Sequence, residues 1–151
     1  MKTLDYPPIW LIAFMALAYA MDRFAPDFGL DVALGNWAAP MGVVLFLTGL
    51  ALTGAAVWEF SRAKTTIIPH RSPDALITSG VFRYSRNPIY LADVLMLSGA
   101  ILYWGAVLAL PLVALFTVIL RKRFIDGEEK RLEDAFPTEF QTYYSSTRRW
   151  I

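Results

Sequence analysis

The stretch VLMLSGAILYWGAVLALPLVALFTVIL, residues 94–120, decides how this chain is organised, because it contains no charged residue. A single helix over residues 87–120 would be roughly 50 Å long at about 1.5 Å per residue, well beyond the ~30 Å hydrocarbon core of a bilayer. The natural break is YWGA, residues 103–106, in which two interfacial aromatic residues precede Gly105. The stretch therefore predicts a helical hairpin that returns the chain to its starting side.

Two further uncharged blocks, residues 6–21 and 32–58, are expected to form the first two membrane-spanning helices. The first begins with Pro7 and Pro8, which suit a helix start. A cleaved signal peptide is its alternative interpretation, disfavoured because Lys2 is the only basic residue ahead of it. The second block carries small residues that would let another helix approach closely. They are Gly42, Gly49, Ala51, Gly54 and Ala55.

The composition supports a membrane protein and excludes several other classes. Hydrophobic residues make up 56% of the chain, charged residues only 18%, and the mean hydropathy is +0.44. A net charge of +1 does not suggest nucleic-acid binding. The chain has no cysteine and one histidine, His70, so we expect neither a thiol nucleophile nor a metal centre. A chain of 151 residues is expected to form one domain.

The distribution of basic residues provides a separate prediction of topology. Five of them lie in residues 61–87 and seven follow residue 120, whereas the loop after the first block has Arg23 against three aspartates. Both basic segments should face the cytoplasm, which requires an even number of spans between them. We therefore expect an all-α integral membrane protein with four transmembrane helices, the third and fourth forming the hairpin. Both termini and a helical C-terminal tail would face the cytoplasm of a bacterial-type inner membrane or its equivalent.

Segments outside the bilayer differ in character. Residues 61–80 are rich in Pro, Gly and hydroxyl side chains and indicate a loop, with a short apolar stretch at residues 75–77. In residues 124–147, acidic and apolar side chains recur at helical spacing, and Pro137 interrupts the pattern. We expect a continuing helix followed by a second, amphipathic helix on the membrane surface.

Two polar clusters flank the hairpin and resemble a known family. The stretch TSGVFRYSRNPIYLAD, residues 78–93, resembles the Gly-x-x-x-x-x-Arg-His-Pro-x-Tyr signature of the isoprenylcysteine carboxyl methyltransferase and phospholipid methyltransferase group. The stretch EEKRLEDAFPTEFQTYYSSTRRWI, residues 128–151, is similar to the C-terminal pattern of that group, with a Glu-Glu pair and two aromatic residues three apart. The resemblance covers roughly residues 64–151.

This resemblance implies S-adenosylmethionine-dependent methyl transfer, with the cofactor in a cytoplasm-facing pocket closed by the C-terminal tail. Within one domain overall, we expect an N-terminal transmembrane helix pair in residues 1–60 and the cofactor-binding methyltransferase core in residues 61–151. Three features depart from the pattern: Asn87 stands in place of histidine, Pro137 in place of glycine, and the alignment around Arg123 is shifted. The catalytic candidates are Glu129 and Arg86. The cofactor-binding candidates are Ile77, Gly80, Phe82, Arg86, Asn87, Pro88, Tyr90, Glu128, Glu129 and Tyr143.

The chemistry of these residues is compatible with that cofactor. Arg86 and Asn87 suit its carboxylate, and the helix that starts at Pro88 presents free amide groups to an anion. Glu128 or Glu129 suits its ammonium group or ribose hydroxyls. The aromatic candidates offer flat surfaces to adenine or the sulfonium. If the acceptor must lose a proton, Glu129 is the expected base, and the acceptor itself should be lipid-like and enter from the bilayer.

Other interpretations stay open at this point. Arg86 could be a positive-inside anchor, the Glu-Glu pair a solvated helix face, and His70 a surface residue. Asp93 could pair with Arg86 or Arg83, or line the pocket. Two other functions are a nicotinamide-dependent membrane reductase of related architecture and a non-catalytic small membrane protein.

Overall fold

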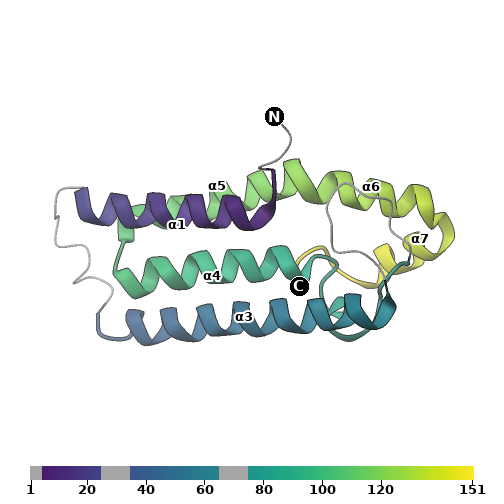
Figure 1. Cartoon of the computed structure of the whole chain (residues 1–151), viewed down its shortest axis with the longest axis horizontal. Helices are drawn as coiled ribbons and strands as arrows, with labels where there is room; N and C mark the ends of the chain where they lie inside the picture. Colours follow the sequence, from purple (N-terminus) through teal and green to yellow (C-terminus); the bar gives the residue numbers. More distant parts are fainter. Residues whose placement is uncertain (1–4, 25–34, 65–74) are drawn as a thin grey trace. The chain divides into compact units, whose positions relative to one another are not determined.

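The computed structural model describes residues 5–24, 35–64 and 75–151, and every regular element in these ranges is helical. The predicted all-α class is therefore confirmed. His70 and the aspartates at positions 27 and 31 lie outside the described residues. In chain order (Figure 1) the elements are α1 (Pro7–Phe24), α3 (Ala38–Ala63), the 3-10 turn η1 (Gly80–Arg83), α4 (Pro88–Trp104), the 3-10 turn η2 (Val107–Ala109), α5 (Leu110–Leu120), the π-helical turn η3 (Arg121–Ile125), α6 (Asp126–Ala135) and α7 (Pro137–Ser146).

The chain packs as two compact units, each assembled from two separate stretches of sequence. Unit 1 consists of Met1–Leu50 and Ala92–Val118, and unit 2 consists of Ala51–Leu91 and Ile119–Ile151. These units differ from the predicted division into residues 1–60 and 61–151, because each unit contains residues from both sides of position 60. Both polar clusters belong to unit 2, apart from Ala92 and Asp93, the last two residues of the first cluster.

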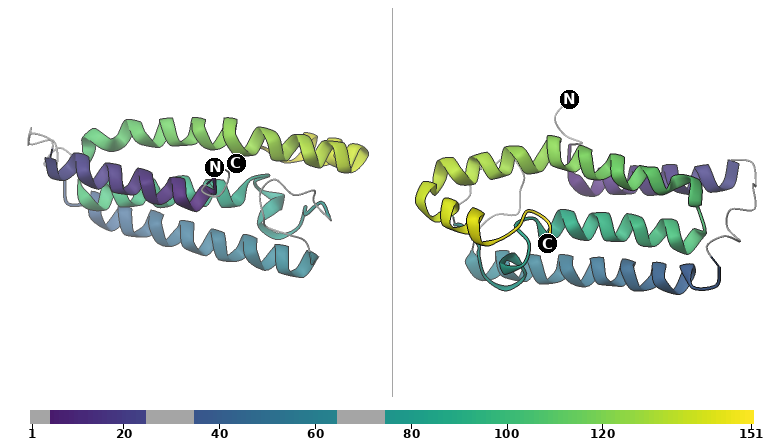
Figure 2. Two further views of the ribbon diagram at one scale, coloured as in Figure 1. Left: turned by 45° about the horizontal axis from the view of Figure 1, so that its top comes forward. Right: turned by 180° about the vertical axis from the view of Figure 1, so that it is seen from behind.

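The predicted hairpin break is confirmed within unit 1. Helix α4 ends at Trp104, the backbone at Gly105 has a φ of 75°, and α5 begins at Leu110 after η2. A positive φ is readily adopted only by glycine, so the YWGA sequence provides the residue that this reversal requires. Figures 1 and 2 show the chain changing direction between α4 and α5.

Glycines allow α3 and α4 to pack with their backbones in close contact in unit 1. A Cβ atom on Gly99 would lie 2.6 Å from the carbonyl oxygen of Gly42 and 2.7 Å from the amide nitrogen of Phe46. One on Gly49 would lie 2.8 Å from the carbonyl oxygen of Ala92. The predicted close approach is thus confirmed at Gly42 and Gly49, whereas a Cβ on Gly54 would meet nothing within 4 Å.

Aromatic contacts join α1 to the hairpin in the same unit. The rings of Phe14 and Phe116 have centroids 5.0 Å apart, and those of Tyr19 and Trp104 are 5.4 Å apart. Phe14 and Phe116 are both buried, so this contact lies in the core of unit 1. Aromatic pairs at such distances contribute beyond the area that they bury.

Helix α3 has the properties of a membrane-spanning helix. In the described part of the chain it is the one helix that is both long and apolar enough to cross a membrane, with a mean hydropathy of 1.9 over its best window. Only 17% of that window is buried, and Val44, Leu47 and Leu50 are exposed. Exposed apolar side chains on an apolar helix suit a lipid environment. Helix α4 is also apolar but shorter, at 17 residues.

The C-terminal elements of unit 2 follow the predicted pattern. Helix α6 continues from η3 and ends at Ala135, and α7 begins at Pro137. Proline is favoured in the first turn of a helix and cannot continue the preceding one, which explains the break. Figure 2 shows α7 folding back from the end of α6. The π-helical turn η3, an insertion often found at functional sites, was not predicted.

The glycine contact in unit 1 can be tested by alanine substitution. We expect Gly42→Ala or Gly99→Ala to destabilise the protein by about 1–3 kcal/mol, because the added methyl group overlaps backbone atoms that cannot move independently. Gly54→Ala is the matched control, and we expect it to be neutral or stabilising because alanine is the better helix former. Thermal unfolding in detergent measures the difference, and equal effects of the three substitutions would contradict a close helix contact.

Candidate functional site

The first half of the site is the turn between η1 and α4 in unit 2. The amide of Asn87 donates to the Ser85 hydroxyl oxygen at 3.1 Å, and the carbonyl of Asn87 accepts the first helical hydrogen bond of α4, from Leu91. Pro88 follows as the first residue of α4 and is buried. Asparagine before a proline suits a helix start, so the sequence determines where the turn ends. The turn places Arg86 and Asn87 side by side just ahead of the helix.

Glu129 on α6 is the centre of the polar contacts. Its Oε1 accepts hydrogen bonds from Nε and Nη2 of Arg86, both at 3.2 Å, and from Nδ2 of Asn87 at 3.4 Å. Arg149 donates to both carboxylate oxygens, with Nε 3.3 Å from Oε1. The side chains of Arg86 and Glu129 are only 6% and 10% exposed. A carboxylate so far from water is stabilised by these charge-assisted bonds.

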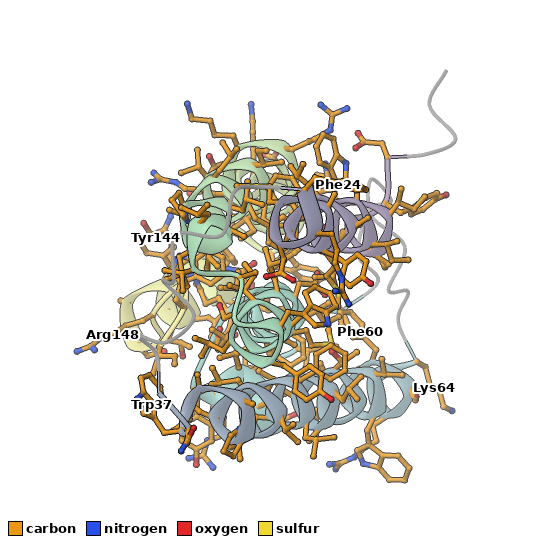
Figure 3. All side chains as sticks on the ribbon, turned by 90° about the vertical axis from the view of Figure 1, so that its left-hand side faces the viewer. Phe24, Trp37, Phe60, Lys64, Tyr144 and Arg148 are labelled. Carbon is orange, nitrogen blue, oxygen red and sulfur yellow. The ribbon has the colours of Figure 1, made fainter. Side chains whose placement is uncertain are left out.

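The C-terminal tail surrounds Arg86 and Asn87 with backbone carbonyls. Nη1 of Arg86 donates to the carbonyls of Tyr144, at 3.2 Å, and Thr147. The amide of Arg86 donates to the carbonyl of Arg148 at 3.0 Å, and Nδ2 of Asn87 donates to that of Arg149 at 3.2 Å. Figure 3 shows the Arg148 side chain pointing outward from the ribbon. The tail is therefore fixed to the turn mainly through its backbone.

Aromatic residues complete the cluster. The Arg86 guanidinium lies 4.1 Å from the centre of the Tyr144 ring, a distance typical of a cation–π contact. The Tyr143 hydroxyl donates to the carbonyl of Phe82 at 2.6 Å. Burial raises the pKa of the Tyr143 phenol, so the group stays protonated and keeps donating.

Glu128 lies next to this network and has a separate partner. The hydroxyl of Tyr90 donates to Oε1 of Glu128 at 2.6 Å, and the Tyr90 ring stacks on Phe124 at 6.1 Å. Burial raises the pKa of Glu128, while the Tyr90 hydrogen bond and the charge of Arg131 oppose that shift. The two neighbouring glutamates therefore have different environments, one held by cations and the other by a phenol.

The structure brings most of the predicted site residues together. Arg86, Asn87 and Tyr90 contact the Glu128–Glu129 pair, and Tyr143 contacts Phe82. Ile77 and Gly80 are placed differently. Ile77 packs in an apolar cluster with Ala56 and Phe82, and Gly80 begins η1 beside Glu59.

Sequence reasoning missed Arg149 and Asp126 as members of the network. Nη1 of Arg149 lies 3.1 Å from Oδ1 of Asp126, in addition to its bonds with Glu129. The sequence presented Arg149 as one basic residue near a tail end rich in them. Arg149 lies 20 residues after Glu129, too far along the chain for the two to be neighbours on one helix. Only the fold of α7 and the tail shows that they form a pair.

The described residues form an all-helical protein in which α3 is long and apolar enough to span a membrane, with a polar, charge-paired site at the start of α4 and on α6. Residues 37–139, more than half of the chain, match the phospholipid methyltransferase family model. The chain belongs to this family, in agreement with the predicted resemblance. It is similar to the cobalt-zinc-cadmium resistance protein CzcN of Cupriavidus metallidurans, at 29% identity over 114 residues. That match covers 75% of this chain and half the length of the relative. No solved structure matches the chain.

The raised pKa of Glu128 predicts a specific dependence of stability on pH. Unfolding exposes the carboxyl group and returns its pKa to about 4.5, so above that pH the folded state holds more protons than the unfolded state. The stability that Glu128 contributes is complete below the unfolded pKa and is lost as the pH rises through the folded pKa. Glu128→Gln cannot ionise and keeps an acceptor for Tyr90.

We therefore expect Glu128→Gln to gain stability relative to the wild type as the pH rises above about 4.5, the pKa of an exposed glutamate. Thermal unfolding over this range measures the difference, and Glu139→Gln controls for removal of an exposed negative charge. A stability difference between Glu128→Gln and the wild type that does not change with pH would contradict the prediction.

Proposed function

We propose that this chain is a membrane methyltransferase that uses S-adenosylmethionine and acts on a lipid-like or otherwise hydrophobic acceptor. The observation that carries the proposal is the buried carboxylate of Glu129, which is paired on either side with the guanidinium groups of Arg86 and Arg149. Membership of the phospholipid methyltransferase family supports methyl transfer as the reaction. The cofactor and the acceptor are our proposals.

The residues present fit the charged end of the cofactor. Its amino-acid part is a zwitterion with one carboxylate and one ammonium group, and the network pairs guanidinium groups with a carboxylate in the same way. A zwitterion can exchange partners with such pairs without leaving a buried charge unpaired. Arg86, Asn87 and Arg149 would hold the carboxylate, and Glu129 the ammonium group. When bound, the cofactor would supply an activated methyl group on its sulfonium.

The protein groups would act mainly by positioning and by excluding water. Methyl transfer is an in-line displacement, and alignment of the reactants accounts for much of the rate in such reactions. Buried aromatic side chains around the polar network, including Phe82 and Tyr143, would keep water out.

The two glutamates differ in their fitness to accept a proton. Three side chains donate hydrogen bonds to the oxygens of Glu129, which favours a binding role for this carboxylate. Burial raises the pKa of Glu128 towards the range in which a carboxylate is an effective general base. If the acceptor releases a proton, we therefore propose Glu128 as the group that takes it.

We further propose that the chain crosses the membrane four times, with the site and both termini on the cytoplasmic side. The length and hydropathy of α3 support one span, and the reversal at Gly105 supports the hairpin. The basic residues of 61–87 and of the tail support the orientation. The acceptor would then reach the site from the bilayer, and membrane lipids would surround the apolar face of α3.

The proposed function predicts binding of S-adenosylmethionine by the purified protein in detergent, measured by isothermal titration calorimetry. We expect Glu129→Gln and Arg149→Gln to weaken binding at least about tenfold, the usual effect of losing one hydrogen bond to a charged group. Asn87→Ala should weaken it in the same direction. Turnover is measured with methyl-labelled cofactor and membrane lipid extracts, in which label should enter the organic phase.

Glu129→Gln removes a buried charge and is expected to cost about 3–5 kcal/mol of stability, so its folding is checked by thermal unfolding before the titration. Arg149 is partly exposed and gives the second, milder variant. Glu139→Gln is the control on the exposed face of α7. Absence of cofactor binding by the wild type, or binding of NADPH instead, would overturn the proposal.

The proposed topology predicts the labelling of single cysteines introduced into this cysteine-free chain. Cysteines at Tyr84 and Asp134 should react with an impermeant maleimide from the same side of the membrane, because both positions belong to unit 2 and are exposed. A cysteine at Trp37, just before α3, should react from the other side. Labelling of positions 84 and 134 from opposite sides would refute the hairpin as a pair of spans.

A further inference from the structure

Glu59 is a buried carboxylate near the C-terminal end of α3 that the proposed reaction does not use. It is 7% exposed and accepts a hydrogen bond from the hydroxyl of Ser79, the residue immediately before η1. Nη1 of Arg62 lies 3.5 Å from its other oxygen, but the Arg62 side chain is 65% exposed. Since a buried carboxylate is destabilising unless it is hydrogen-bonded, Glu59 depends on Ser79.

Gly80, the first residue of η1, fits against the same carboxylate. Its backbone has a φ of 56°, in the left-handed region. A Cβ atom on Gly80 would lie 2.6 Å from Cδ and 2.8 Å from Cγ of Glu59. The backbone conformation therefore favours glycine at this position, and a larger residue would displace the Glu59 side chain.

One residue further along α3, an apolar contact holds the same turn. The rings of Phe60 and Phe82 meet edge to face, with centroids 5.5 Å apart and an angle of 85° between them. Figure 3 shows Phe60 turned to the inner side of α3, whereas Lys64 points outward. Phe82 is buried in a cluster with Ala56 and Ile77. Helix α3 thus contacts η1 through one polar and one apolar pair.

The turn held in this way leads directly to the proposed cofactor site. The carbonyl of Phe82 accepts the Tyr143 hydrogen bond, and the carbonyl of Arg83 accepts one from Thr147 at 3.5 Å. Arg86 and Asn87 follow within four residues. A shift of η1 would therefore change both the contacts with α7 and the approach of Arg86 to Glu129.

We propose that Glu59 is a positioning residue for the cofactor site: through Ser79 and Gly80 its carboxylate fixes η1 and the turn that carries Arg86 and Asn87. The proposal rests on the proposed function for its effect on the cofactor, but its effect on the turn stands without it. Glu59 is not among the residues proposed to touch the cofactor or the acceptor.

Hydrogen–deuterium exchange followed by mass spectrometry tests the effect on the turn. Glu59→Ala and Ser79→Ala should raise the exchange rate of the amides in residues 80–87 by about tenfold, the factor expected for one hydrogen bond to a charged group. Glu59→Gln keeps an acceptor oxygen for Ser79 and should restore much of the protection. Arg62→Gln removes only the exposed ion pair of Glu59 and is the matched control.

Calorimetry on the same variants tests the effect on the site. Variants with faster exchange in residues 80–87 should bind S-adenosylmethionine more weakly. We expect Arg62→Gln to bind like the wild type, Glu59→Ala to bind most weakly, and Glu59→Gln to have an intermediate affinity. Ser79 is exposed, so Ser79→Ala gives a folded variant even where loss of Glu59 prevents folding. Exchange in residues 80–87 that is the same in Ser79→Ala and Arg62→Gln would overturn the proposal. Normal protection with no cofactor binding by the wild type would overturn only the proposed function.

A double-mutant cycle separates the two reasons for glycine at position 80. Gly80→Ala should destabilise the protein less in the Glu59→Ala background, because the added methyl group no longer meets the carboxylate. Additive effects would mean that only the backbone conformation requires glycine, and they would count against the contact with Glu59.

Discussion

A buried carboxylate between two guanidinium groups is the interaction on which unit 2 depends. Glu129 connects three segments that are distant in sequence: the turn with Arg86 and Asn87, helix α6, and the tail with Arg149. Removing this one charge would leave two cations facing each other in a site from which water is largely excluded, which is strongly destabilising. The backbone carbonyls of Thr147 and Arg149 accept hydrogen bonds from Arg86 and Asn87, and the Arg149 side chain is held by the same carboxylate. The turn, helix α6 and the tail thus meet at one carboxylate.

The two units differ in the contacts that hold each of them together. In unit 1, Gly42, Gly49 and Gly99 allow close van der Waals contact between α3 and α4, the kind of contact that holds helices together in lipid. In unit 2, charged and polar groups have left water and must find partners within the protein. Both kinds of contact occur together at Gly80, where the absence of a side chain leaves room for the buried carboxylate of Glu59.

The sequence predicted those features that depend on local chemistry or on a complete motif. The break at Gly105, the break at Pro137 and the meeting of Asn87 with Glu129 all follow from residues that favour one conformation or belong to a family pattern. Arg149 could not be assigned, because nothing in a basic tail distinguishes the residue that folds back on Glu129. Glu59 could not be assigned either, because a single acidic residue at the end of an apolar helix is typical of a membrane boundary and its partner Ser79 lies 20 residues further along the chain.

Asn87, the residue that departs from the family pattern, has a physical explanation in this network. Its Nδ2 donates to two acceptors at once, Oε1 of Glu129 at 3.4 Å and the carbonyl oxygen of Arg149 at 3.2 Å. An amide nitrogen carries two hydrogens, whereas each imidazole nitrogen carries at most one, so a histidine could not serve both acceptors from a single atom. Histidine would also change its charge near neutral pH and disturb the balance between Glu129 and its two arginines. An amide keeps that balance constant, which suits a turn held simultaneously by a carboxylate and by the tail backbone.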